Sequence, residues 1–140
     1  MAVSYVKFHC FVEDLAEKKH DLGSDTLKVA LTNTGPTAAT DAVIGDITQI
    51  AYTNLASDPT SREFTATTSA QSSGTYTLDA DDIVLTASDT LPTFQYVVIY
   101  NETSAADNLI AYYDYGSAVN LSAASTFTIT FDGAGILTIA

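Results

Sequence analysis

The sequence predicts an all-β protein, an antiparallel β-sandwich of jelly-roll-like type with one short N-terminal helix. Residues 94–101 form a short, strongly apolar run of aromatic and β-branched residues, bounded by Pro92 and by the polar segment 101–107. That length and composition favour a strand buried on both faces over a helix. Several further strand-like segments, separated by turn signals, are available to cover those two faces, so a layered β architecture follows.

The N-terminal region predicts a strand or arm and then the helix. Residues 5–10 are typical of a short strand or an extended arm, and we treat residues 1–10 as an N-terminal arm. From residue 8 onward the apolar side chains recur at helical spacing, and acidic residues occupy the other face. The helix should end before Gly23. The apolar positions are Phe8, Phe11, Val12 and Leu15.

Residues 26–74 contain one clear strand pattern and several weaker ones. Residues 26–32 alternate, with Leu27, Val29 and Leu31 on one side, which predicts a half-buried strand followed by a turn at 33–37. Residues 37–58 carry only a weak pattern, compatible with a short helix or with a loop packed on the core. The threonine-rich stretch 62–70 indicates a strand with one exposed face, and residues 71–74 a turn.

The second half of the chain contains the regular alternation. Short strands are expected at 75–78 and 82–86, around an acidic turn, and another at 109–115, ended by Gly116. Residues 126–131 alternate perfectly, 132–135 have turn composition, and 136–139 are again strand-like. This pattern predicts a terminal β-hairpin whose core-facing side chains are Phe127, Ile129 and Phe131.

Length and charge limit the classes of function. A chain of 140 residues fits a single domain, residues 1–140. Its formal net charge is −12, and no basic residue follows Arg62. Without a basic patch in the second half, neither nucleic-acid binding nor attraction to an anionic membrane is expected. The start lacks the pattern of a signal peptide, and no apolar run reaches the ~18 residues of a membrane span.

The residues that carry chemistry do not assemble into a catalytic set. Cys10 lies in the apolar stripe of the predicted helix, which favours a buried, inert thiol over a nucleophile paired with a histidine. Asp79, Asp81 and Asp82 could give oxygen ligands to a hard cation, but a complete calcium loop is absent and a solvated acidic turn is the preferred interpretation. Asp114 has no partner for acid–base catalysis. We therefore predict no enzyme activity, no cofactor and no metal site.

Tyrosines are the best candidates for an interface. They concentrate in the segments 94–101 and 109–115, where they can fill the core or provide a large contact area at low entropic cost. The arm adds aromatic and basic side chains in an otherwise acidic chain. The predicted partner-binding residues are Tyr5, Lys7, Phe8, Tyr112, Tyr113 and Tyr115.

Taken together, several segments of the chain resemble a family of small, acidic, threonine-rich structural proteins of tailed bacteriophages. The segments are 11–16 (FVEDLA), 23–33 (GSDTLKVALTN), 46–50 (DITQI), 94–101 (FQYVVIYN) and 113–116 (YDYG), together with Lys7 and Phe8. They extend over nearly the whole chain and contain no catalytic motif. The resemblance implies a virion protein, in particular a decoration (cement) protein on the outside of the capsid.

The resemblance also implies partners and location. The major capsid protein would be the partner, and the chain would act as a homo-oligomer, with a trimer favoured, on the capsid exterior after synthesis in the host bacterial cytoplasm. An alternative is a tail or fibre-associated module that binds a host surface or a glycan through its tyrosines. A small hydrolase using Asp79, Asp81 or Asp114 is the third, least supported class.

Overall fold

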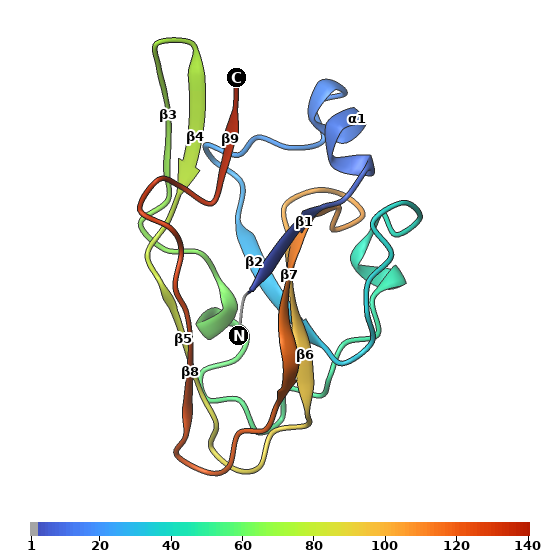
Figure 1. Ribbon diagram of the computed structural model, residues 1–140, viewed down its shortest axis with the longest axis vertical. Helices are drawn as coiled ribbons and strands as arrows, with labels where there is room; N and C mark the ends of the chain where they lie inside the picture. The colour runs from blue at the N-terminus through green and yellow to red at the C-terminus, as the bar shows by residue number, and fades with distance from the viewer. Residues whose placement is uncertain (1–2) are drawn as a thin grey trace.

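The computed structural model describes residues 3–140, which form nine β-strands, one α-helix and two short 3-10 helices (Figure 1). No helix in this part of the chain is long and apolar enough to cross a membrane. The all-β class with one N-terminal helix is confirmed; the jelly-roll connection stays a prediction. The elements are β1 (Ser4–Lys7), α1 (Cys10–Ala16), β2 (Leu27–Thr32), η1 (Ile44–Asp46), η2 (Thr60–Arg62), β3 (Thr68–Ser72), β4 (Thr75–Asp79), β5 (Ile83–Thr86), β6 (Phe94–Asn101), β7 (Leu109–Val119), β8 (Thr126–Ile129) and β9 (Leu137–Ile139).

A four-stranded antiparallel sheet with the order β1-β7-β6-β2 forms one layer of the molecule. The expectation that residues 94–101 are buried on both faces is confirmed in β6. Val97 and Ile99 join the main core, whereas Val98 and Tyr100 join a second cluster of buried side chains. Because side chains alternate along a strand, these two sets lie on opposite faces of the sheet. The sheet is therefore covered on both sides.

The second layer consists of two smaller sheets, β3-β4-β9 and β5-β8, which lie to the left of the four-stranded sheet in Figure 1. The main core fills the space between the layers, with Leu31, Leu78, Leu85 and Phe94 all 2% exposed or less. A Ser73-Gly74 turn, in which both residues have positive φ, joins β3 to β4.

The predicted terminal hairpin is wrong. β8 pairs with β5, and β9 pairs with β4, so the two C-terminal strands never pair with each other. Residues 126–139 instead run antiparallel to residues 75–86 as one interrupted ribbon. The predicted inward direction is confirmed for Ile129 and Phe131, each 7% exposed, and Phe127 packs against the same core.

The segment 132–135 interrupts this ribbon instead of reversing it. The Asp82 carboxylate accepts a hydrogen bond from the Phe131 amide at 3.0 Å, and the Ile136 amide donates to the Leu78 carbonyl at 2.7 Å. Gly135 has a φ of 109°, and a Cβ at this position would lie 2.5 Å from Thr77 Cγ2. The turn composition therefore serves a bulge that lies close to the neighbouring strand.

Three other expectations need correction. β2 is buried along its whole length instead of on one face, because Lys28, Ala30 and Thr32 are covered as well. β7 continues through Gly116 to Val119, since the glycine accommodates an irregularity in the register and does not end the strand. The stretch 62–70 contains the buried Arg62 in η2 and only the beginning of β3.

The helix is shorter than its sequence pattern. It begins at Cys10, after Phe8, and Phe8 is fully buried in the second cluster. Phe11 packs into the main core, whereas Val12 is 56% exposed. The Cys10 thiol is half-buried, with its Sγ 3.7–3.8 Å from three backbone carbonyl oxygens. Burial raises the pKa of the Cys10 thiol, and the nearby Asp14 carboxylate adds to this.

Candidate functional site

The outer strands of the four-stranded sheet, β2 and β1, have very different surroundings. The outer side of β2 is covered, and we call it the closed edge: the Phe64 amide donates to the Leu27 carbonyl at 2.9 Å, and the Ile50 amide donates to the Leu31 carbonyl at 3.0 Å. The Tyr52 hydroxyl accepts from the Leu31 amide at 2.8 Å. Loops and side chains thus replace a neighbouring strand along β2.

Arg62 is the centre of the closed edge. It is 6% exposed, and its Nη1 donates to the Val29 carbonyl at 2.9 Å while its Nε donates to the Asp58 carboxylate at 2.6 Å. The guanidinium carbon lies 3.9 Å from the centroid of the Tyr52 ring. Burial opposes the charge, but the hydrogen bond to Asp58 and the neighbouring Tyr52 raise the pKa of Arg62 above its usual value. Nearby, the buried Lys28 forms ion pairs with Glu63 and Glu102.

The outer side of β1 has no such cover among residues 3–140, and we call it the open edge. The Phe8 amide donates to Ile110 on β7, and Tyr5 and Lys7 lie opposite Tyr113 and Ala111. Because backbone groups of an antiparallel strand alternate in direction, the amides and carbonyls of Tyr5 and Lys7 point away from β7. Neither residue has a further backbone partner in the described chain. The open edge therefore presents unused strand-pairing groups.

An apolar groove of about 430 Å³ lies beside the open edge, between the two layers. The strand β8 and the segment 130–136 that connects it to β9 lie on its far side. Asp132 is the single charged residue in its lining. The complete lining is Val3, Tyr5, Val97, Tyr113, Tyr115, Phe127, Thr128, Ile129, Thr130, Asp132, Gly135 and Ile136.

Aromatic rings shape the groove. The Tyr5 and Tyr113 ring centroids are 5.2 Å apart, and those of Tyr115 and Phe127 are 5.5 Å apart in an edge-on contact. Burial raises the pKa of Tyr113 to about 12, so its hydroxyl stays neutral at physiological pH. Val3, Tyr5 and Tyr115 are 52%, 41% and 37% exposed, which places three of the most exposed large apolar residues at this one groove. Such a cluster is typical of a binding surface.

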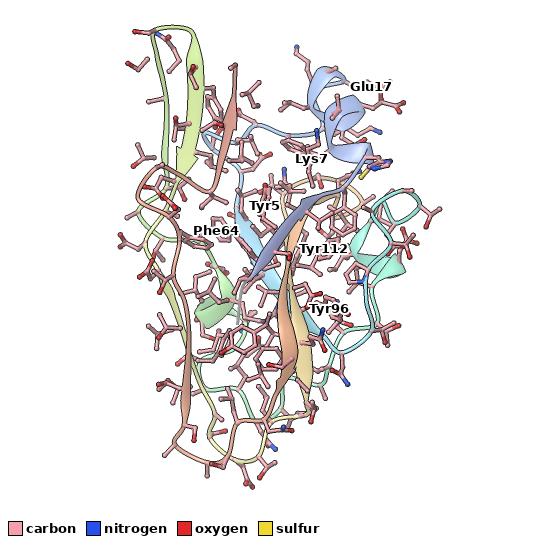
Figure 2. The ribbon with its side chains drawn as sticks, viewed as in Figure 1. Tyr5, Lys7, Glu17, Phe64, Tyr96 and Tyr112 are labelled. Atoms are coloured by element: carbon pink, nitrogen blue, oxygen red, sulfur yellow. The ribbon has the colours of Figure 1, made fainter. Side chains whose placement is uncertain are left out.

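The structure divides the six predicted partner-binding residues into two groups. Tyr5, Tyr113 and Tyr115 meet in the groove. Phe8 and Tyr112 pack together on the opposite face of the sheet with ring centroids 5.3 Å apart, and Phe8 is 0% exposed. Figure 2 shows Tyr112 and Tyr96 on the side of the sheet away from the second layer.

Lys7 completes the predicted set at the end of β1. It is exposed and forms no ion pair among the described residues. As for the predicted arm, residues 4–7 are the strand β1, and residues 1–2 lie outside the described part of the chain. Of the predicted partner-binding residues, Tyr5 and Lys7 therefore lie on the open edge.

The sequence analysis missed the part of the groove contributed by the second layer. Phe127 and Ile129 were expected to face the core, and they also line the groove at its edge. Val3 and Ile136 were not singled out. The apolar alternation of residues 126–131 was the single local signal for this part of the groove. It could not show that these residues lie opposite β1, because that position depends on their pairing with β5.

Three of the four acidic candidates, Asp79, Asp82 and Asp114, accept hydrogen bonds within the described chain. Asp79 accepts from the Ala80 amide at 2.9 Å, and Asp82 accepts from Phe131. Asp114 accepts from Gln95 Nε2 at 2.9 Å and from the Gly116 amide at 2.7 Å. No group of three or more histidine, cysteine or acidic residues that could hold a metal ion occurs within residues 3–140.

A buried polar cluster joins the segment after α1 to the end of β6. Asn101 accepts hydrogen bonds from the amides of Thr103 and Ser104 through Oδ1, so its Nδ2 is the atom that meets Asp25 and, at 3.1 Å, His20 Nδ1. His20 Nδ1 is therefore the acceptor, and Nε2 carries the proton of the neutral ring. His20 is 6% exposed and its Nε2 has no partner in the described chain. Burial lowers the pKa of His20, against the opposing effect of Asp14 and Asp25.

Comparison of the chain with protein-family models, with curated proteins and with solved structures gave no match. The geometry therefore carries the functional argument. The open edge and its groove are suited to hold an extended, apolar polypeptide segment.

Proposed function

We propose that the protein is a non-enzymatic virion structural protein that binds the major capsid protein on the outside of a tailed-phage capsid. The observation that carries the proposal is the apolar groove beside a sheet edge that has no neighbouring strand within residues 3–140. The sequence resemblance to phage structural proteins supplies the class of partner. Both point to assembly and not to turnover of a substrate.

The charge distribution supports an external location. A net charge of −12 repels packaged nucleic acid, while the groove contributes a single carboxylate, that of Asp132. The acidic remainder of the surface keeps the protein in solution until it docks. Assembly as a homo-oligomer, with a trimer favoured, belongs to the same proposal, because decoration proteins occupy symmetric positions on a shell.

Quantitative mass spectrometry of purified particles tests the location. The proposal expects a copy number near a simple fraction of that of the major capsid protein. A handful of copies per particle would indicate a tail component instead, and absence from the particle would refute the virion assignment.

A binding assay with three exposed valines tests the surface. Val3 in the groove, Val12 on α1 and Val84 on β5 are 52%, 56% and 53% exposed. Val3→Ser should weaken binding to undecorated shells several-fold, because it removes apolar contact area. Val12→Ser and Val84→Ser remove the same group outside the groove and should bind as the unmodified protein does. Equal effects of all three substitutions on binding would contradict the groove as the docking surface.

A further inference from the structure

We propose that the open edge accepts an extended, uncharged or basic segment of the capsid protein, which adds to the four-stranded sheet as a fifth strand beside β1. The inference rests on the proposed function, since it takes the capsid protein as the partner. It specifies how the partner binds: through backbone hydrogen bonds to β1 and side chains in the groove.

The first argument is the contrast between the two edges of one sheet. Along β2, four of the six outward backbone groups of Leu27, Val29 and Leu31 are bonded, by Phe64, Arg62, Tyr52 and Ile50. Along β1, the outward groups of Tyr5 and Lys7 have no partner in residues 3–140. An unpaired strand of this kind is a template for another strand.

The second argument is the position of the groove. It is lined by Val3 and Tyr5 of the open edge and by Phe127 and Ile129 of the opposing layer. In an added strand, every second side chain would point toward this apolar space and the others toward solvent. The occupant is therefore a segment with apolar residues at alternate positions, and the four residues of β1 limit its paired length.

Charge decides between the capsid protein and a second copy of this chain. A second copy carries a net charge of −12, so its pairing at the open edge would bring like charges together; the proposed homo-oligomer therefore forms through other surfaces. The groove adds the carboxylate of Asp132, which disfavours an acidic occupant and favours a basic one. The chain's own C-terminal strand β9 is already held by β4.

Amide hydrogen exchange on the unmodified full chain tests the inference. In the free protein, the amides of Tyr5 and Lys7 should exchange rapidly, whereas that of Phe8, bonded to Ile110, should be protected. After binding to shells assembled from the major capsid protein, exchange at Tyr5 and Lys7 should slow at least about tenfold. Exchange can be quenched on the shell and located by fragmentation mass spectrometry.

The outcomes separate this inference from the proposed function. Failure to bind shells at all would remove the proposed function. Binding with unchanged exchange at Tyr5 and Lys7 would retain that function and overturn strand addition. Protection that arises in concentrated protein without shells would identify a second copy as the occupant, which also overturns the inference.

A pair of substitutions at Lys7 isolates the backbone contribution. Lys7→Pro removes the outward amide, while Lys7→Ala keeps the amide and removes only the side chain. Proline is tolerated at an outward position of an edge strand, because no hydrogen bond to β7 is lost. Lys7→Pro should bind shells at least about fivefold more weakly than Lys7→Ala, with the two melting temperatures compared as a folding control. Equal binding by two folded variants would contradict the inference.

Discussion

The closed and open edges of the four-stranded sheet show two ways in which this chain treats an outer strand. At the closed edge, the protein covers β2 with Tyr52, Arg62 and Phe64, and four of the six outward backbone groups of β2 have a partner within residues 3–140. At the open edge, the outward backbone groups of Tyr5 and Lys7 have no partner within residues 3–140 and lie beside an aromatic groove. The difference indicates that the closed edge contributes to stability, and it agrees with our proposal that the open edge binds a partner. The contacts of each edge also predict how much a substitution there lowers the free energy of unfolding.

The largest effect is expected at the centre of the closed edge. Arg62→Ala leaves the Val29 carbonyl and the Asp58 carboxylate without their donor and removes the cation from the Tyr52 ring. Breaking a buried charged contact of this kind should lower the free energy of unfolding by about 3 kcal/mol. Urea denaturation of the variant and of the unmodified protein measures this loss in the free energy of unfolding. Arg62→Lys keeps the charge but not the planar guanidinium, so its loss of unfolding free energy should lie between those of the unmodified protein and Arg62→Ala. If neither variant is less stable than the unmodified protein, the closed edge does not contribute to stability as stated.

A smaller loss is expected from the Tyr52 hydroxyl. Tyr52→Phe leaves the Leu31 amide without its acceptor and should cost about 1–2 kcal/mol. Tyr113→Phe is the matched change at the groove and should cost less, because the Tyr113 hydroxyl makes no hydrogen bond within residues 3–140. A larger loss from Tyr113→Phe would reverse the comparison.

The same pair of tyrosines predicts an alkaline response. Burial raises the pKa of Tyr52 and of Tyr113 to about 12, above the ~10 of an unfolded tyrosine. The unfolded chain therefore loses these protons first, so the stability is complete below pH ~10 and declines as the pH rises toward 12. Urea titrations at several alkaline pH values should show a shallower decline in each phenylalanine variant than in the unmodified protein.

An acid response should arise away from both edges, at His20. Because burial lowers the pKa of His20 below the ~6.5 of an unfolded histidine, the unfolded chain takes up the proton first, and stability falls as the pH drops below that value. His20→Gln keeps an acceptor for Asn101 and should reduce the loss between pH 8 and 5. His9→Gln is the matched substitution at an exposed histidine and serves as the control. Equal behaviour of the two variants would contradict the assignment.

The smallest effect on stability is expected in the groove beside the open edge. Tyr115 is 37% exposed and contacts Phe127, so Tyr115→Ser should lower the free energy of unfolding by less than about 1 kcal/mol. Binding to shells should weaken about tenfold, as for an aromatic residue central to an interface. A large stability loss without a binding defect would show that the groove belongs to the core and not to an interface.

Local composition was enough to indicate the strands, because alternation and β-branched residues reflect the immediate surroundings of each residue. The apolar run of β6 predicted burial on both faces, and the alternation of residues 126–131 predicted which side chains of β8 face inward. The tyrosine-rich segment at 109–115 likewise indicated the aromatic lining of the groove at Tyr113 and Tyr115.

Tertiary pairing decided what local composition could not. The segments 126–131 and 136–139 have the composition of a hairpin, but β8 and β9 pair with β5 and β4, which lie beside them in the second layer. Phe8 and Tyr5 are similar aromatic candidates in sequence, yet one is fully buried and the other faces the groove, since successive strand positions point to opposite faces. Which edge is closed and which is open follows from contacts between residues far apart in the chain, for which a single sequence holds no local signal.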